Sequence, residues 1–252
     1  DGSDNNDGLT AATPWQTIDK VNASLGSLSS GDGVLFRRGD TFYGTVNVAK
    51  SGSAGNPITF GAYGVGDKPI ISGFTEITSW TSIGGGIYTA DVACESSCNM
   101  VIIDGSQYAL GKWPNDGWHY IDNTDGNTYI SDASITNDYN WTGAEIVIRK
   151  NRWVIDRCQI TNHDGSTLSF SNTSSYPAQV SWGYFIQRSA STLDDFGDWH
   201  HDNSNGKLYM YFGAENPNNH IVKISTLDRG IYNWAYDYIS VDNIRFEGAN
   251  TE

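Results

Sequence analysis

The chain has 252 residues and a formal net charge of −14, from 15 Lys and Arg against 29 Asp and Glu. Because nucleic acids and anionic membranes bind clusters of basic side chains, and because no stretch of about 18 apolar residues occurs, we expect neither nucleic-acid binding nor membrane insertion. The 28 Gly, 9 Trp and 14 Tyr are typical of short strands joined by turns, so the composition predicts an all-β protein.

The first residues include an oxygen-rich turn, SDNNDG. Ser3, Asn5 and Asp7 alternate before Gly8, as oxygen ligands do in a calcium loop. The segment lacks the Asp that opens such loops and a Glu at the usual distance downstream. Turns rich in Asx residues also form without an ion, because their side chains cap backbone amides. Calcium at these three residues is therefore one hypothesis, and a metal-free turn is the other.

A single helix is predicted in ATPWQTIDKVNASL. Thr13 is placed as its N-cap, Pro14 as its first residue, and Gln16 as the partner that completes a capping box. The apolar residues then recur at helical spacing on one face. They are Trp15, Ile18, Val21 and Leu25.

Four short apolar segments follow, and their starts are separated by about 12 residues, with Gly, Asp, Asn and Pro turns between them. This spacing predicts a coil of strands, a β-solenoid, in which two such units make about one rung and the helix covers the open end. Arg38-Gly39-Asp40 falls in one of the turns, where a polar sequence is expected for structural reasons. The segments are residues 34–36, 46–48, 58–60 and 70–72.

The chain has three cysteines. Cys94 and Cys98 are close enough in sequence for a small-loop disulfide, which is the natural interpretation in an exported protein. Cys158 has no evident partner. A zinc site is disfavoured because it needs about four ligands and no second Cys or His pair follows at ligand spacing.

From about Thr75 the 12-residue period is lost and longer alternating segments appear, with tight turns at Asp164-Gly165 and Asn205-Gly206. Such segments predict an antiparallel β-sandwich. Within its last strand, Leu208, Met210 and Phe212 are expected to face one way. The segments are residues 144–150, 152–160, 166–170, 182–187 and 207–212.

Two segments hold side chains that could carry chemistry. In KWPNDGWHY, Trp113, Trp118 and His119 are candidates for contact with a sugar, because a pyranose ring stacks on an aromatic face; the alternative is that they fill a core. DDFGDWHHD offers paired carboxylates. However, neighbouring His200 and His201 in a strand point to opposite faces, so an ordinary strand is the favoured interpretation.

Six separated segments, in order, resemble the N-terminal region of secreted bacterial right-handed parallel β-helix proteins, a group that contains polysaccharide lyases and glycoside hydrolases. The opening GSDNNDGLTAATPWQTIDKVN resembles their capping region. Their first rungs are similar to GDGVLFRRGDTFYG and NPITFGAYGVGDKPIISG. An inserted β-sandwich in a subset of them is similar to IIDGSQYALGKWPNDG, TGAEIVIRKNRWVIDRCQI and TLDDFGDWHHDNSNGKLYMYF.

The resemblance implies three parts: a cap with the first rungs at residues 1–74, an inserted sandwich at 75–228, and a return to the β-helix at 229–252. It also implies a protein that is secreted or held at the cell surface, with a polysaccharide or glycan as its partner. Family members carry catalytic residues on middle rungs, which would lie beyond Glu252, so no catalytic residue is assigned.

We therefore expect the front part of a polysaccharide hydrolase or lyase, with a chain that continues past residue 252. The alternative is a non-catalytic module that binds glycans or builds an adhesin or surface filament.

Overall fold

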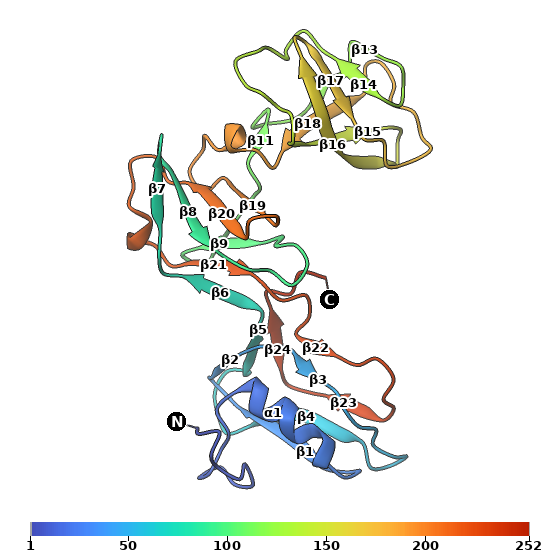
Figure 1. The fold of residues 1–252 in the computed structure, drawn as a ribbon. Helices are drawn as coiled ribbons and strands as arrows, with labels where there is room; N and C mark the ends of the chain where they lie inside the picture. Colours follow the sequence, from blue (N-terminus) through green and yellow to red (C-terminus); the bar gives the residue numbers. More distant parts are fainter. Residues whose placement is uncertain (1, 252) are drawn as a thin grey trace. The chain divides into compact units, whose positions relative to one another are not determined.

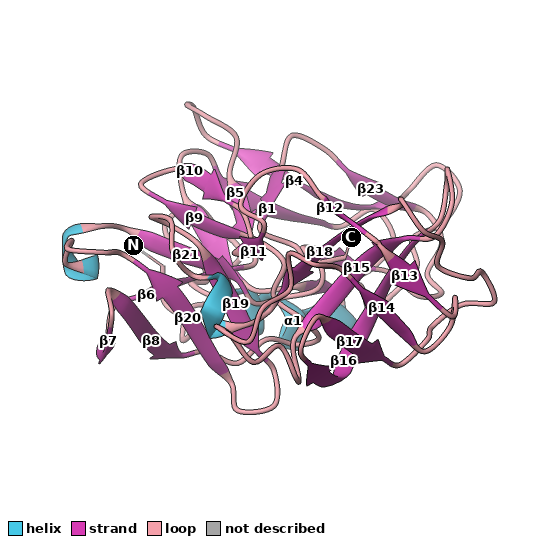
Figure 2. Ribbon diagram, turned by 90° about the horizontal axis from the view of Figure 1, so that it is seen from above, coloured by secondary structure: helices cyan, strands magenta, loops and turns pink. Residues whose placement is uncertain are grey.

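The computed structural model describes residues 2–251 and is all-β, as predicted, with one short α-helix and most strands in antiparallel sheets (Figure 2). Contacts divide the chain into two compact units. The first contains residues 2–76, 93–100 and 223–251, and the second contains residues 77–92 and 101–222. Residues 93–100 thus belong with the first unit, although they lie inside the segment expected to form the insertion.

The first unit contains three small sheets, and every strand pair in them is parallel. Two of these sheets have three strands and the third has two (Figure 1). In sheet order they are β1 (Gly33–Arg37), β4 (Ile58–Tyr63) and β23 (Ile239–Val241); β2 (Thr41–Tyr43), β5 (Ile70–Ser72) and β24 (Arg245–Glu247); and β22 (Ile231–Tyr232) with β3 (Val46–Asn47).

The pairing follows the order of the chain. Strands β1, β2 and β3 pair in turn with β4, β5 and β22, and then β4 and β5 pair with β23 and β24. Val34 lies opposite Phe60, and Phe42 opposite Ile71. Strands occur at all four of the apolar segments expected from the 12-residue spacing, while β2 occupies a segment that the spacing did not indicate.

The helix α1 (Ile18–Ser24) begins four residues later than predicted, because Thr17 and not Thr13 is its N-cap. The Thr17 side chain accepts a hydrogen bond from the Lys20 amide at 3.1 Å. The carbonyl of Pro14 cannot start a helix, since it accepts hydrogen bonds from the Ser3 amide and the Asn6 side chain. The capping-box prediction was wrong for this non-local reason. A short 3-10 helix, η1 (Leu25–Ser27), follows α1.

The helix covers the core of the first unit. Ile18 and Val21 are buried on its inner face and Leu25 is buried in η1, and Val34 and Phe36 of β1 belong to the same apolar cluster. Trp15 packs against this cluster from the segment that precedes the helix. Arg38 and Gly39 form the corner after β1, where their amides donate to the Tyr63 and Asp67 carbonyls. These backbone bonds give Arg38-Gly39-Asp40 a structural place in the turn.

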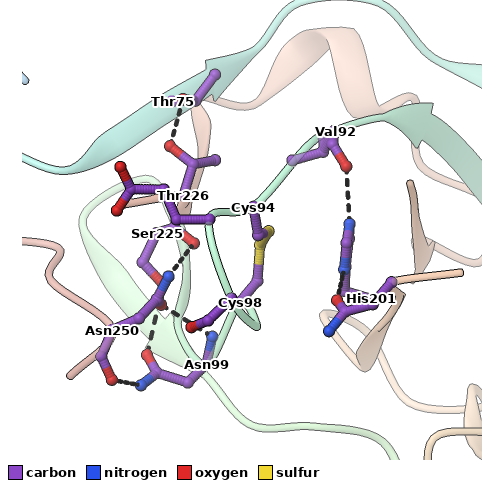
Figure 3. The surroundings of a disulfide bond; sticks show 12 residues. Thr75, Val92, Cys94, Cys98, Asn99, His201, Ser225, Thr226 and Asn250 are labelled. Carbon is purple, nitrogen blue, oxygen red and sulfur yellow. Dashed lines mark hydrogen bonds between the residues drawn. A yellow bond between two sulfur atoms is a disulfide. The ribbon is translucent and has the colours of Figure 1, made fainter. Parts of the chain in front are cut away.

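A disulfide joins Cys94 and Cys98 in the first unit (Figure 3). The loop it closes is attached to the later part of the unit by hydrogen bonds, which run from the Glu95 amide to the Thr226 carbonyl and from the Asn99 amide to the Asn250 side chain. The strands β6 (Phe74–Ile77) and β21 (Val222–Ser225) lie at the ends of two of the first unit's segments. The third cysteine, Cys158 in the second unit, is a buried free thiol.

The second unit is dominated by an eight-stranded antiparallel sheet. Its longest strand, β16, takes part in both halves of the sheet, with a register shift between Ile160 and Asn162. Strand β12 also pairs with β18 at one end. In sheet order the strands are β11 (Lys112–Trp113), β18 (Gly183–Gln187), β15 (Glu145–Arg149), β16 (Ile155–Asp164), β17 (Thr167–Phe170), β14 (Tyr129–Ser131) and β13 (Asn123–Thr124), with β12 at His119–Tyr120.

The remaining strands of this unit form a four-stranded antiparallel sheet and a hairpin. Leu208, Met210 and Phe212 are buried while Tyr209 and Tyr211 are half-buried, which confirms the predicted alternation. The sheet contains β19 (Trp199–Asp202), β20 (Lys207–Tyr211), β8 (Ile87–Asp91) and β7 (Thr81–Gly84), and the hairpin β9 (Val101–Ile103) with β10 (Ser106–Tyr108); η2 (Ala190–Thr192) and η3 (Pro217–Asn219) are 3-10 turns.

Both predicted hairpins are present, between β16 and β17 and between β19 and β20. Within residues 2–251, no helix has the length and apolar character needed to cross a bilayer.

Candidate functional site

The segment KWPNDGWHY forms two short strands, and both pair with β18. Trp113 lies opposite Ile186, and His119 lies opposite Tyr184. Because neighbouring residues of a strand point to opposite faces, Trp113 and His119 share the face of the buried Ile186 and Tyr184, whereas Trp118 lies on the other face. The structure therefore brings two of the three candidate sugar-contacting residues together and separates the third from them.

The inner face carries a closely packed aromatic group. The rings of Trp113 and His119 stack with centroids 4.1 Å apart, and Trp113 also lies 5.5 Å from the fully buried Trp141. The core of the large sheet includes Trp141, and Trp113 packs against it. This is the arrangement of a core margin, because the partly buried rings of Trp113 and His119 pack onto the fully buried Trp141.

A buried carboxylate completes the inner group. The Tyr184 hydroxyl donates to Asp132 at 2.7 Å, and Nδ1 of His119 lies 3.8 Å from the same carboxylate oxygen. Burial lowers the pKa of His119, and the Asp132 charge opposes this effect. Burial, together with the hydrogen bond to Asp132, raises the pKa of Tyr184 far above its usual value. The phenol therefore stays protonated and serves as a fixed donor to a buried charge.

The outer face of the same sheet carries Trp118. Its ring lies 4.9 Å from that of Phe185 in an edge-on arrangement, and the Lys112 ammonium group lies 5.5 Å from the Phe185 ring. A Cβ atom at Gly183 would come within 3.1 Å of the Trp118 side chain. Glycine at position 183 thus makes room for the indole, which is half-buried.

A row of polar side chains crosses this outer face beside Trp118. Glu145 of β15 lies opposite Gln159 of β16 on one side and opposite Gln187 of β18 on the other. Arg157 is two residues from Gln159 and shares its face, so its Nε donates to Glu145 at 2.7 Å. Antiparallel register, together with the two-residue alternation, therefore collects side chains from three strands.

A shallow pocket lies at this row, with a volume of about 190 Å³. Three of its five lining residues are polar or charged, and the other two are small. Four of the 15 basic residues of the chain lie on or beside this sheet face. They are Lys112, Arg149, Arg157 and Arg188. The pocket is lined by Gly143, Ala144, Glu145, Gln159 and Arg188.

The acidic segment DDFGDWHHD is organised by hydrogen bonds within the second unit. The Asn115 side-chain amide donates to both Asp194 and Asp195 at 2.9 Å, which links these carboxylates to the loop before Trp118. The Asp198 carboxylate accepts the backbone amides of the same two residues, and burial raises its pKa. Both of these neighbouring carboxylates therefore accept a structural hydrogen bond from Asn115.

The two histidines of this segment have separate surroundings. His200 stacks on Tyr209 with ring centroids 4.8 Å apart, and burial lowers its pKa to about 4. One ring nitrogen of His201 lies 2.8 Å from the Val92 carbonyl oxygen and the other 2.6 Å from the Asn203 side chain. They do not share one ligand, as the alternation along β19 predicts.

The predicted calcium ligands lie in the N-terminal turn. Ser3 Oγ accepts the Asn5 amide at 3.3 Å, while Asp7 Oδ1 accepts the Leu9 amide and the Thr13 hydroxyl. The Thr13 hydrogen bond lowers the pKa of Asp7. The Asp7 carboxylate and the Ser3 hydroxyl thus cap the backbone of their own turn, as the metal-free alternative describes. Calcium at these residues stays a prediction.

Sequence reasoning missed the polar row. The alternation of RWVIDRCQI contained one signal, because it places Arg157 and Gln159 on one face, opposite the buried Cys158 and Ile160. Their meeting with Glu145 and Arg188 depends on strand pairing, which no local pattern indicates.

No known family profile matches the chain. A segment of 75 residues is 39% identical to a lacto-N-biosidase of Bifidobacterium longum subsp. longum, covering 28% of this chain and 5% of that protein. A solved structure described as a glycoside hydrolase superposes with a TM-score of 0.76 at 17% identity, over 98% of this chain and 49% of the other. A complex of XylC with xylose gives a TM-score of 0.52 at 16% identity, over 99% of this chain and 34% of that one.

The chain therefore spans at most about half the length of the proteins it matches. At such identities the superpositions establish a shared fold.

Proposed function

We propose that this chain is the N-terminal part of an exported carbohydrate-active protein built on a right-handed parallel β-helix, which acts on a polysaccharide as a glycoside hydrolase or lyase. The observation that carries the proposal is the succession of parallel pairs in which β1, β2 and β3 are followed by β4, β5 and β22. This order of parallel pairs supports the proposal, because a solenoid chain returns to each of its sheets once in every turn.

The comparisons support the same proposal. Nearly the whole chain superposes on about half of a solved glycoside hydrolase, and a 75-residue segment is 39% identical to a lacto-N-biosidase. The Cys94–Cys98 disulfide fits an oxidising compartment, in keeping with a secreted or surface-held protein.

The proposal places the catalytic residues on later turns of the helix. Within the described residues, β22, β23 and β24 each pair on one side only, so three parallel edges are open to a further turn. An open strand edge is a template for another strand. The outer face of the second unit then serves as a glycan contact, with Trp118 as the aromatic surface for a sugar ring.

The glycan contact is tested by affinity electrophoresis of the chain in gels that contain different polysaccharides. We expect at least one polysaccharide to retard the chain, and Trp118→Ala to abolish the retardation. Trp153→Ala is the matched control, since Trp153 is 77% exposed in the turn before β16. Retardation by none of the polysaccharides would contradict the glycan contact.

A second candidate is a non-catalytic module that binds glycans or assembles into an adhesin or filament. The open parallel edges favour it, because edge strands also pair between copies. Turnover by the full-length protein, compared with turnover by this chain, separates the two. Activity confined to the longer protein supports the enzyme, whereas binding without turnover in both supports the module.

A further inference from the structure

Arg188 follows β18 directly and has an unusual backbone. Its φ angle is +59°, in the left-handed region that residues other than glycine seldom adopt. Such strain persists where the surroundings hold the residue in place, and it is concentrated at ligand sites. The conformation aims a long cationic side chain at the pocket beside Glu145 and Gln159.

The Arg188 guanidinium has one buried donor without an acceptor, its Nε. This nitrogen lies 3.5 Å from Glu145 Oε2, as an ion pair without hydrogen-bond geometry, and the side chain as a whole is 23% exposed. A guanidinium carries five N–H donors. A buried donor without an acceptor is costly, so this group is suited to a ligand that brings acceptor atoms.

The neighbouring Glu145 carboxylate forms an ion pair with Arg188 through Oε2 but accepts no hydrogen bond from it. Glu145 Oε1 accepts from Arg157 Nε at 2.7 Å and also from the Gln187 side-chain amide. Two guanidinium groups therefore surround one carboxylate that is already hydrogen-bonded, which leaves one positive charge in excess. The local charge is opposite in sign to the −14 of the whole chain.

The size and position of the pocket limit the ligand. Its volume of about 190 Å³ is below the roughly 300–1,000 Å³ of pockets for drug-sized ligands, so it fits one sugar residue or end group. Gln187 lies two residues from Phe185, the ring against which Trp118 packs. A sugar chain in contact with Trp118 would therefore reach the pocket with a neighbouring residue.

We propose that this pocket binds the carboxylate of an acidic sugar residue, with the Arg188 guanidinium as its main donor. The inference rests on the proposed glycan contact and specifies its substrate class. Planar guanidinium groups match carboxylates by two parallel N–H···O bonds, a geometry that a neutral hydroxyl cannot provide.

The test is isothermal titration of the full 252-residue chain with tetragalacturonate, with neutral xylotetraose and with sodium acetate. We expect tetragalacturonate to bind on the order of tenfold tighter than the neutral tetramer, and its affinity to fall with added salt. Acetate should bind weakly and compete with tetragalacturonate, because it offers the carboxylate alone.

Two variants keep the test independent of folding. Arg188→Gly and Arg188→Asn place residues that tolerate the left-handed conformation, so the melting temperature should not fall. Both should lose about tenfold in tetragalacturonate affinity while xylotetraose binding is unchanged. Arg152→Gln, which removes an exposed arginine of the same unit, should leave both affinities at their original values.

The outcomes separate this inference from the proposed function. Equal affinity for the acidic and neutral tetramers, or full affinity in Arg188→Gly, overturns the acidic-sugar site and leaves the glycan contact in place. Binding of acetate without either tetramer shows a site for small carboxylates and overturns the sugar assignment. Binding of none of the three ligands contradicts the site, and the separate polysaccharide gels then decide the wider proposal.

Discussion

The two faces of the sheet formed by β16, β15 and β18 use similar residue types for different purposes. On the inner face, Trp113 and His119 stack beside the buried Trp141 and the Asp132–Tyr184 pair. On the outer face, Trp118 packs on Phe185 beside a polar row in which one buried donor, Arg188 Nε, lacks an acceptor. The contrast teaches that an aromatic, polar loop does not itself define a site, because strand register decides on which side of the sheet each of its side chains lies.

The largest expected effect is on stability and comes from truncating the buried Trp141 on the inner face. Trp141→Ala should lower the free energy of unfolding by about 3–5 kcal/mol, because the 1% exposed indole leaves a large cavity. Urea denaturation measures the loss. Trp153→Ala, at an exposed site of the same unit, should change stability by less than about 0.5 kcal/mol. Similar losses from both variants would contradict the division into core and surface.

The same contrast between interior and surface applies to the histidines of the second unit. The pKa of His200 falls from about 6.5 when unfolded to about 4 when folded, so the unfolded chain binds an extra proton between these values. The contribution of neutral His200 to the free energy of unfolding is complete above pH 6.5. It is lost as the pH falls to 4, and the loss is about 3 kcal/mol in all. Urea midpoints between pH 7 and 4 measure this loss, and a parallel loss in His200→Asn would show that other groups cause it.

A smaller effect is expected where the outer face meets Trp118. Gly183→Ala should cost about 1–3 kcal/mol, because its Cβ would press on the indole at 3.1 Å. Tryptophan emission should shift as Trp118 moves, and retardation by polysaccharide should weaken. Gly26→Ala is the control, since no atom lies within 4 Å of a Cβ there. An unchanged emission spectrum would place Trp118 elsewhere.

The smallest effect, with opposite sign, comes from His220. Its ring lies 2.7 Å from Asp104 and 2.9 Å from Glu215, and the Asp104 hydrogen bond raises its pKa. The stabilisation is complete below about pH 6.5 and is lost as the pH rises through the folded value. His220→Gln should therefore destabilise the protein at pH 6 more than at pH 9. An equal change in urea midpoint at both values would contradict the ion pairs.

Local patterns predicted some elements well. The alternation of residues 207–212 correctly oriented a strand, and the 12-residue spacing located β1, β3, β4 and β5. Both follow from side-chain direction along a strand, which is a short-range property.

The failures depended on contacts between residues distant in sequence. Asp4 accepts the amides of Gln16 and Thr17 and so moves the start of α1, although no helix pattern includes Asp4. Trp118 and His119 are adjacent in sequence, but the alternation at β12 directs their side chains to opposite faces of the sheet. The left-handed backbone of Arg188 and its buried Nε without an acceptor both depend on the fold, and no local pattern indicates them.

The parallel pair of β3 and β22 also bears on how the chain folds. The Thr45 hydroxyl donates to the Arg229 carbonyl across 184 residues of chain. The entropy cost of closing a loop grows with its flexible length, so a second unit that is already folded shortens the effective loop. During synthesis, β1 to β5 emerge long before β22. The ladder at β3 is therefore expected to close late, after the second unit has acquired its own core, and defects in that core should slow the completion of the first unit.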